Sequence, residues 1–500
     1  MNVATKTIKI AVDFDCDISG AEVYSDAKYE YTCSLTYADI GMNSNKFYIM
    51  QVIVAKGAYY LYTKYGRTGE KGTSFSKPIN TLNQAIKLFQ SQYRSKTGNT
   101  WGADFKPQPN KYFKLEVDNY EEEVSIESDE ESEASSDLEK QVIELIGLIS
   151  NTDIHTKAMR SFGVDTKKMP LGKISTGIIN DANNILYALS EIVAAIADGT
   201  WKESKEALGI TDDYVKDIIY NLSNKFWTRI PYACGRQKPP LIDTPYQIDQ
   251  CAELLDLMKN TKIASQLTKK SAGISTIYNG IDTEITWCSD PTERNLVTNF
   301  VMGTKAPTHR YNLEVLEIFS INKSTNDDNN LFYKMSNHVL LAHGSRMSNF
   351  MGILSTGLRV PADNQVSNGS ILGRGIYFAD VISKSFNYCN AIDTDNIGFV
   401  LLCEVALGDK YDDHETVVPY GSPNVPMGYT CRRGLGQTDV TKYSTVECVG
   451  NGINYTMTIP SGGLEKRGKL SDASSFLYNE YVIFNAFQYR FRYLVKIKSC

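Results

Sequence analysis

The sequence predicts an α+β protein of several domains: a small β-rich domain with one helix, an α-helical bundle, and a larger domain of mixed, mostly antiparallel β-structure. The chain has 500 residues, which is too long for one compact domain and suits about three. An acidic, serine-rich run separates a β-rich beginning from a segment with helical periodicity. From about residue 281 onward, short β-type runs alternate with Gly, Asn and Asp clusters.

The composition is that of an ordinary globular chain and excludes several classes of protein. Hydrophobic residues make up 42% and charged residues 22%, with a formal net charge of −6. No apolar run is long enough to span a membrane, and no apolar signal-peptide core follows Lys6 and Lys9. The ten cysteines form no C-x-x-C pair, and the five histidines lack metal-ligand spacing. We therefore expect a soluble intracellular protein in a reducing compartment, without a metal and without membrane association.

The β-rich beginning is predicted from two aromatic and β-branched runs. Residues 46–54 and 59–64 read as antiparallel strands joined by a tight turn at Lys56-Gly57. A glycine-rich turn is expected to open at Tyr65-Gly66-Arg67, and residues 83–94 have helical spacing.

The acidic run is the clearest boundary in the chain. Between Glu121 and Glu139 there are ten acidic residues and no basic ones. Such a segment cannot bury enough apolar surface to fold, so we expect a solvated spacer whose Glu and Ser side chains are accessible to modification. The predicted boundaries are an N-terminal segment at 1–30, the β-rich domain at 31–119, the disordered linker at 120–137, the helical domain at 138–268 and the C-terminal domain at 281–500.

The segment after the linker changes to helical periodicity. Apolar residues recur at helical spacing in four stretches, with prolines as stops between them. These stretches are residues 138–149, 178–197, 211–222 and 246–258.

Four short motifs in the C-terminal region carry the functional signal. They are His343-Gly344-Ser345-Arg346, then residues 373–380 (GRGIYFAD), 383–388 (SKSFNY) and 477–481 (LYNEY). Alone, each has an ordinary explanation: a structural histidine, a turn, or a charge on an edge strand for Glu480. Together and in this order, they resemble the poly(ADP-ribose) polymerase family of diphtheria-toxin-like ADP-ribosyltransferases.

The resemblance extends over most of the chain. Residues 40–113 are similar to the family's WGR domain, and residues 138–265 to its helical regulatory domain, including the run 168–173 (KMPLGK). The order of domains resembles a short, DNA-dependent member without zinc fingers.

The chemistry of this family explains the types of residue. Breaking the bond between nicotinamide and ribose creates an oxocarbenium-like centre with a good leaving group, so orientation and charge stabilisation matter more than strong acid catalysis. The resemblance gives Glu480 the role of the carboxylate that holds the ribose, steadies positive charge and polarises the nucleophile. His343 would bind the adenine-side ribose, and Lys384 would lie near the glutamate.

The resemblance also assigns the NAD+ contacts. Gly344 and Ser385 would hold the nicotinamide amide, while Tyr388 and Tyr377 would enclose its ring. Ser345 and Arg359 would meet the adenosine half. Ser370 stands where polymerising relatives often have a tyrosine.

Acceptor and regulatory positions follow in the same way. His309 and Tyr478 occupy the positions where the family binds the acceptor ADP-ribose, which favours chain elongation. The loop at residues 448–469 is unusual and leaves chain length open. Glu253 and Asp256 match the acidic face that the family's helical domain turns toward the NAD+ site, although a solvated helix face explains either residue equally well.

The expected partner is DNA with strand breaks, such as nicks or 5′-phosphorylated ends. Tyr65 replaces the tryptophan of the WGR motif and can still stack on an exposed base or sugar. Arg67 retains the phosphate-pairing fork, and Asn45 lies in the Asn-rich entry to the first long strand. Recognition would be of end geometry and phosphate, not of base sequence.

We therefore expect an NAD+-dependent poly-ADP-ribosyltransferase in the nucleus. It would be activated by DNA strand breaks and would modify itself and nearby proteins in the response to DNA damage. Two alternatives remain open: a mono-ADP-ribosyltransferase with an altered acceptor site, and a break-binding scaffold with little catalysis. NAD+ is expected as substrate, with no metal.

Overall fold

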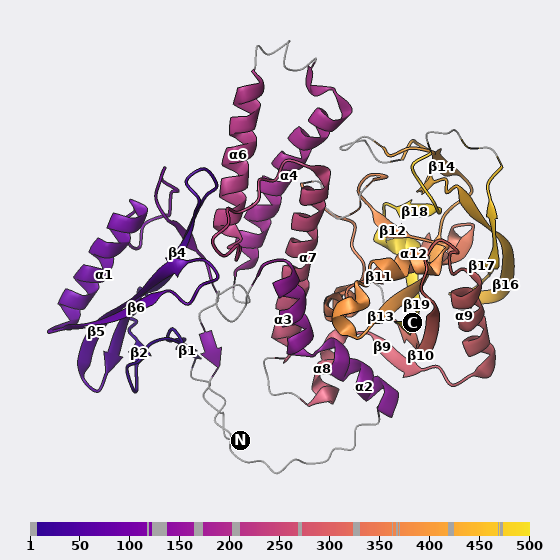
Figure 1. The fold of residues 1–500 in the computed structure, drawn as a ribbon. Helices are drawn as coiled ribbons and strands as arrows, with labels where there is room; N and C mark the ends of the chain where they lie inside the picture. The colour runs from indigo at the N-terminus through magenta and orange to yellow at the C-terminus, as the bar shows by residue number, and fades with distance from the viewer. Residues whose placement is uncertain are drawn as a thin grey trace. The chain divides into compact units, whose positions relative to one another are not determined.

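The computed structural model describes residues 8–117, 120–122, 138–164, 174–202, 211–268, 273–323, 331–362, 364–366, 369, 371–418, 425–468, 470 and 474–500. The chain divides into two compact units, each described by itself. The first comprises Met1–Ala134 and Met159–Leu255, and the second comprises Ser135–Ala158 and Asp256–Cys500. Helix α7 (Pro245–Thr268) therefore contributes residues to both units (Figure 1).

The first unit begins with an antiparallel sheet of order β6-β5-β4-β3-β7, with β2 paired to β4. Helix α1 (Leu82–Thr97) packs on this sheet and starts where the Thr81 hydroxyl accepts from the Gln84 amide. The predicted hairpin is confirmed, because Lys56 and Gly57 both have positive φ at its turn. The strands are β2 (Glu22–Val23), β3 (Thr32–Asp39), β4 (Ser44–Ala55), β5 (Ala58–Arg67), β6 (Thr73–Ile79) and β7 (Phe113–Leu115).

Two local predictions in this unit are wrong. Strand β5 continues through Arg67, so Tyr65 to Arg67 pair with neighbouring strands and the turn follows them at Gly69. Strand β8 (Tyr120–Glu122) pairs with β1 (Ile8–Ile10), although the acidic sequence predicts a disordered linker from residue 120 onward. Main-chain pairing overrides the acidic composition there. The rest of the predicted linker, residues 123–137, lies outside the described residues. The KMPLGK run at residues 168–173 also lies outside them.

The helical region is predicted correctly in kind, but the last three of its four predicted helices extend further. In the first unit α4 (Thr176–Asp198) and α6 (Asp212–Arg229) lie side by side (Figure 1). Helix α6 also contacts the sheet, since the Thr36 hydroxyl donates to the Thr228 carbonyl at 2.6 Å. Helix α3 (Thr152–Ser161) is divided between the units, while α2 (Lys140–Ile149) and α8 (Ile274–Ile281) belong to the second.

The second unit is built on two sheets. A seven-stranded sheet has the order β16-β17-β11-β13-β19-β10-β9, and a four-stranded sheet has the order β12-β18-β15-β14. Pairing is antiparallel except between β11 and β17 and between β14 and β15, which confirms the predicted mixed, mostly antiparallel class. The strands are β9 (Glu284–Trp287), β10 (Leu313–Asn322), β11 (His338–Ser345), β12 (Ile376–Phe378), β13 (Ile397–Ala406), β14 (Tyr411–His414), β15 (Cys431–Gly434), β16 (Thr438–Gly450), β17 (Ile453–Lys466), β18 (Glu480–Ile483) and β19 (Tyr489–Ser499).

The loop predicted at residues 448–469 is wrong. Those residues belong mainly to a long hairpin of β16 and β17, and its two-residue turn is Asn451-Gly452, both with positive φ. An Asn-Gly pair is the residue combination that favours such a turn. The hairpin joins the seven-stranded sheet through β17, which pairs with β11.

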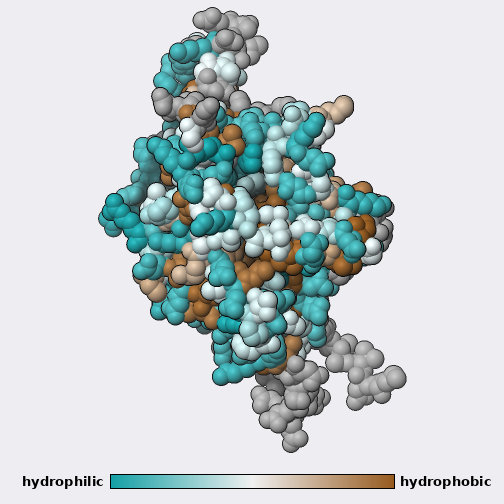
Figure 2. Space-filling model, turned by 90° about the vertical axis from the view of Figure 1, so that its right-hand side faces the viewer, coloured by the Kyte–Doolittle hydropathy of each residue, from teal (hydrophilic) through white to brown (hydrophobic). Residues whose placement is uncertain are grey.

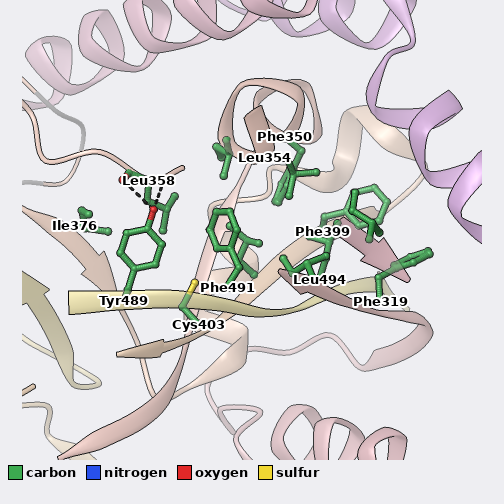
Figure 3. Close-up of a cluster of buried hydrophobic side chains, with 14 of the residues drawn as sticks. Phe319, Phe350, Leu354, Leu358, Ile376, Phe399, Cys403, Tyr489, Phe491 and Leu494 are labelled. Atoms are coloured by element: carbon green, nitrogen blue, oxygen red, sulfur yellow. Dashed lines mark hydrogen bonds between the residues drawn. The ribbon is translucent and has the colours of Figure 1, made fainter. Parts of the chain in front are cut away.

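A hydrophobic cluster lies between the seven-stranded sheet and the elements that cover it (Figure 3). Phe319, Phe399 and Leu494 come from its strands, and Phe350 from α11 (Phe350–Thr356). Each such fully buried side chain contributes ~1.5–3 kcal/mol relative to exposure. Tyr489 on β19 brings a hydroxyl into this cluster, where it accepts from the Leu358 amide at 2.6 Å and donates to the Leu358 carbonyl at 3.1 Å.

The remaining helices of the second unit lie around the sheets. They are α9 (Pro291–Gly303), α10 (Leu331–Lys334) and α12 (Ile382–Asn387). Among the residues that the structure describes, no helix has the length and apolar character needed to cross a bilayer. The face drawn in Figure 2 is mostly hydrophilic, and its hydrophobic residues gather in a broken band across the middle.

Candidate functional site

The candidate catalytic residues lie where the two sheets of the second unit join. His343 is on β11, Tyr377 is on β12, and Glu480 begins β18. The backbones of Ala342 and Ala379 exchange hydrogen bonds of 2.8 and 2.9 Å, which tie β11 to β12. Strand β18 lies between β12 and β15, so Glu480 occupies an inner strand and not an edge. Its side chain is only slightly accessible.

Glu480 is paired with a partly buried lysine. Lys384 on α12 places Nζ 2.5 Å from Glu480 Oε1 and also donates to the Tyr478 carbonyl at 3.1 Å. Burial lowers the pKa of Lys384, and the Glu480 carboxylate opposes that shift. The pair fixes the direction of the carboxylate at the start of β18. Its second oxygen can accept a hydrogen bond from a hydroxyl group.

His343 is held in one tautomer by the backbone of β12. Its Nδ1 lies 2.9 Å from the Tyr377 carbonyl, which can only accept, so Nδ1 carries the proton and Nε2 is the acceptor nitrogen. Burial lowers the pKa of His343 and keeps the ring neutral. A neutral imidazole in this orientation can bind a sugar hydroxyl.

Tyr377 closes the glycine-rich turn that precedes its strand. Its hydroxyl donates to the Gly373 carbonyl at 2.6 Å and accepts from the Leu372 amide at 2.9 Å. Gly375 permits this close packing, because a Cβ there would lie 2.6 Å from the Ile483 carbonyl oxygen. Burial raises the pKa of Tyr377, so the phenol stays protonated.

Gly344 and Ser385 are adjacent in space. A Cβ on Gly344 would lie 1.7 Å from the Ser385 carbonyl oxygen, so only glycine fits. The buried Ser385 hydroxyl donates to the Ala342 carbonyl at 2.9 Å, which leaves oxygen lone pairs that can accept from an amide. Tyr388 follows α12 and is 50% exposed, so its ring is accessible to a flat ligand.

The residues predicted for the adenosine half lie at the end of β11 and just after α11. The Ser345 hydroxyl accepts from Asn349 Nδ2 at 3.0 Å. Arg359 is exposed and donates to the Thr356 hydroxyl from Nε and a terminal nitrogen, at 3.1 and 2.6 Å. The Tyr489 hydroxyl holds the backbone of Leu358, which precedes Arg359 in the sequence (Figure 3). Ser370 lies outside the described residues.

The two predicted acceptor residues meet beside the Lys384–Glu480 pair. The rings of His309 and Tyr478 are 5.7 Å apart, and the Tyr478 hydroxyl is 2.6 Å from the Thr308 hydroxyl. His309 Nδ1 is 2.8 Å from the Ser383 hydroxyl. Burial lowers the pKa of His309, and the charges of Lys305 and Lys384 lower it further. The histidine is therefore neutral and lies close to Lys384.

The two predicted regulatory residues lie on α7 in different units. Asp256, in the second unit, accepts from Gln365 Nε2 at 3.4 Å and lies 3.8 Å from Lys259 Nζ. Gln365 belongs to the stretch between Arg359 and Tyr377. Glu253 is half-buried in the first unit. Asp256 is thus joined by a hydrogen bond to the stretch that precedes Tyr377.

The first unit carries an aromatic row on its sheet. The Tyr65 ring stacks on Tyr48 with centroids 5.7 Å apart and on Phe75 with centroids 6.1 Å apart. Tyr65 is 42% exposed and Phe75 is 53% exposed. Lys96 Nζ lies 4.6 Å from the centre of the Tyr48 ring. Stacked exposed rings with a nearby cation are typical of surfaces that bind unpaired bases.

Arg67 and Asn45 make contacts within the chain. The Arg67 guanidinium donates to the Asn43 carbonyl at 3.0 Å and to the carbonyls of Gly235 and Gln237. Asn45 is buried and donates to the Tyr232 carbonyl at 2.6 Å. Both side chains therefore hold the segment 232–237 against the sheet. Their contacts with phosphate stay predictions.

Sequence comparison identifies three known domains in the order seen in the structure. Residues 31–108 match the WGR domain, 136–284 the poly(ADP-ribose) polymerase regulatory domain, and 292–499 the poly(ADP-ribose) polymerase catalytic domain. The chain belongs to the poly(ADP-ribose) polymerase family. The site described above lies in the catalytic domain, which is an NAD+-dependent ADP-ribosyltransferase domain. The clusters of His, Cys, Asp and Glu in the described part of the chain include none that could hold a metal ion.

Full-length relatives in the family agree with this assignment. The chain is 30% identical to poly [ADP-ribose] polymerase 2 of Homo sapiens, over 98% of this chain and 83% of that protein. It is 31% identical to poly [ADP-ribose] polymerase 2 of Arabidopsis thaliana, over 94% and 73%. It is 33% identical to poly [ADP-ribose] polymerase 1 of Xenopus laevis, over 99% of this chain and 49% of that protein, so it spans about half of that longer relative.

Several residues that contact the candidate catalytic site or the aromatic row of the first unit were missed by sequence reasoning. Gln365 contacts Asp256, and Phe75 extends the stack on Tyr65. Asp380 and Asn479 form a buried hydrogen bond beside Glu480. Asp380 and Asn479 lie within the quoted motifs, but no local signal pairs residues 99 positions apart.

Proposed function

We propose that the protein is a poly-ADP-ribosyltransferase that DNA strand breaks activate, and that it modifies itself and nearby proteins. The observation that carries this proposal is the meeting of His343, Tyr377 and Glu480 from three strands, with Glu480 paired to Lys384 of α12. A scaffold without catalysis has no physical need for a buried, ion-paired carboxylate in this position. NAD+ would be the substrate.

The residues divide the chemistry between them. Gly344, Ser385 and Tyr388 would hold the nicotinamide end, so that the bond from nicotinamide nitrogen to ribose carbon is oriented for cleavage. Glu480 would accept from a ribose hydroxyl and stabilise positive charge as nicotinamide leaves with the bonding electron pair. An acceptor oxygen then bonds to the same ribose carbon, and its proton passes toward the carboxylate and on to solvent.

The position of His309 and Tyr478 supports elongation. Both lie near Lys384, and a neutral His309 can bind the hydroxyl of an incoming ADP-ribose unit. A terminal unit bound there would present its hydroxyl to Glu480. If these residues do not bind such a unit, the product is mono-ADP-ribose.

DNA-end binding is supported by the row of Tyr48, Tyr65 and Phe75. Tyr65 has less area than the tryptophan usual in this motif, and Phe75 adds a second exposed ring beside it. A base or sugar at a broken end could stack on this pair, while Lys96 attracts phosphate. A role at DNA breaks would place the protein in the nucleus.

Tyr65→Ala is expected to weaken stimulation by DNA, because it removes the central ring of the row. The DNA concentration for half-maximal stimulation should rise roughly 5- to 150-fold, since one base stack contributes about 1–3 kcal/mol. The measurement is a titration of nicked DNA against the rate of nicotinamide release. Tyr214→Ala, which removes another exposed ring of the first unit, is the control. An unchanged titration for Tyr65→Ala would exclude Tyr65 from the DNA site.

Asp256→Ala is expected to raise activity in the absence of DNA. The Asp256–Gln365 hydrogen bond ties α7 to the stretch before Tyr377, so its loss should favour the open state of the regulatory helices. We expect the DNA-independent rate to rise roughly 5-fold, with the DNA-stimulated rate little changed. Asp243→Ala, an exposed carboxylate just before α7, is the control. A basal rate equal to wild type would remove this contact from the switch.

The proposed activity is tested by incorporation of labelled NAD+ with and without nicked or blunt DNA that carries a 5′-phosphate. We expect a DNA-dependent smear of high mass. A sharp DNA-dependent band would identify mono-transfer, and labelling that ignores DNA would contradict the proposed switch. No labelling under any condition would contradict the enzyme assignment.

A further inference from the structure

A buried carboxylate lies directly behind the catalytic glutamate. Asp380 is 1% exposed, and its Oδ2 accepts from Asn479 Nδ2 at 2.8 Å and from the Tyr481 hydroxyl at 3.0 Å. Asn479 and Tyr481 are the two residues that flank Glu480 in the sequence. One carboxylate therefore holds the side chains on both sides of the catalytic residue.

The same carboxylate is fixed to the other catalytic strands. Asp380 directly follows Ala379, whose backbone exchanges two hydrogen bonds with Ala342, the neighbour of His343. Ala379 in turn follows β12, the strand of Tyr377. Asp380 thus links the three segments: it is adjacent in sequence to the residues that join the Tyr377 and His343 strands, and its side chain bonds to the neighbours of Glu480.

Asn479 extends this arrangement to the base of the β16–β17 hairpin. Its second amide contact is to Asp439 Oδ1 at 2.8 Å, and its own Oδ1 accepts from Arg467 at 3.1 Å. Arg467 and Asp439 form an ion pair at 2.8 Å. A fully bonded amide in a buried network has one allowed orientation, so it restricts the backbone before Glu480.

We propose that Asp380 is a positioning residue for catalysis: by holding Asn479 and Tyr481, its carboxylate sets the position of Glu480 at the reacting ribose. The inference rests on the proposed transferase activity and names a residue that acts through Glu480 and does not touch the substrate. A shift of about 1 Å in a catalytic group can cost about 100-fold in rate.

The protonation state of Asp380 gives the inference a distinctive consequence. Burial raises the pKa of Asp380 to about 6; the hydrogen bonds from Asn479 and Tyr481 and the charge of Lys384 oppose the shift, while Asp439 adds to it. Tyr443 also faces this carboxylate from β16. Above pH 6 the anion accepts both hydrogen bonds, whereas below pH 6 protonation weakens them. The turnover number should therefore fall on the acid side of about 6.

Stability should respond in the opposite sense. Because the folded-state pKa is raised above the ordinary value for aspartate, the fold binds this proton more tightly than the unfolded chain does. Ionised Asp380 therefore costs stability above pH 6, and that cost disappears as the pH falls below it. Replacing Asp380 with neutral asparagine should leave stability at pH 8 equal or greater while it reduces catalysis. A residue with only a structural role would lower both.

The test compares full-length wild type, Asp380→Asn and Asp413→Asn. Asp413 is a matched control, because it pairs with Arg433 in the same sheet and has no described bond to Asn479 or Tyr481. With nicked DNA at pH 8, Asp380→Asn should lower kcat for nicotinamide release roughly 10- to 100-fold, with KM for NAD+ within about twofold and an unfolding midpoint no lower than wild type. The acid limb near pH 6 should disappear from its kcat profile. Asp413→Asn should match wild type.

A kcat within about twofold of wild type, or an acid limb that persists in Asp380→Asn, would overturn the inference. If Asp380→Asn does not fold, Tyr481→Phe decides, because it removes only the hydroxyl that bonds to Asp380. It should lower kcat about 5-fold, and an unchanged kcat would overturn the inference. Turnover by the wild-type protein is the reference. If the wild-type protein shows no turnover, the proposed transferase function itself is refuted. If the wild-type protein turns over and the variants are equally active, only the role of Asp380 is refuted.

Discussion

Glu480→Gln should lower the rate of nicotinamide release by roughly 10²- to 10⁴-fold while the protein remains folded. The change removes the negative charge that would stabilise the oxocarbenium-like centre and polarise the acceptor. Glutamine keeps an amide oxygen that can still accept from Lys384, so the side chain can stay in place. Release of nicotinamide and product size should be measured in the presence of nicked DNA.

Glu447→Gln is the matched control for this result. Glu447 is an exposed carboxylate on β16, where it accepts from the Thr456 hydroxyl. Its replacement should leave both nicotinamide release and polymer length unchanged. Full activity in Glu480→Gln would remove Glu480 from the mechanism, and with it the role assigned to the Lys384–Glu480 pair.

Gly344→Ala should abolish productive NAD+ binding. A Cβ at this position would overlap the Ser385 carbonyl oxygen at 1.7 Å, so β11 and α12 must move apart. Because these two elements would hold the nicotinamide end, we expect kcat/KM for NAD+ to fall about 100-fold or more. Thermal unfolding and steady-state kinetics should be measured together.

Gly468→Ala is the control for the glycine substitution. A Cβ on Gly468 would meet nothing within 4 Å, and its φ is not positive. That variant should match wild type in kcat/KM and unfolding midpoint. If Gly344→Ala also kept its kcat/KM, the nicotinamide end could not be bound between Gly344 and Ser385.

Much of the site could be predicted because its functional side chains lie in short local sequence motifs. The His343 and Glu480 segments each carry a motif whose neighbours resemble one family, and the matched domains follow in that order. The strands around them were also predictable, since buried runs such as β13 are apolar apart from Glu404. Local sequence therefore located the reacting groups without any knowledge of their contacts.

The rest depended on contacts between distant segments. The bond between Asp380 and Asn479 joins residues 99 positions apart, and no periodicity encodes it. The inner position of β18 follows from its pairing with both β12 and β15, which the sequence leaves open. The β16–β17 hairpin was not predicted although Asn451-Gly452 favours its turn, because the pairing of its two strands is not visible in the unusual sequence of residues 448–469. Arg67 illustrates a related limit, since its donors reach carbonyls of a segment about 170 residues away.

The most direct test of the account is a crystal structure of the protein with a non-hydrolysable NAD+ analogue. We predict that the carboxamide of the nicotinamide mimic binds between Gly344 and Ser385, with its ring against Tyr388. The adjoining ribose should then hydrogen-bond to Glu480, and the adenine-side ribose to His343. An analogue bound elsewhere, or one whose ribose lies out of hydrogen-bonding reach of Glu480, would contradict the account.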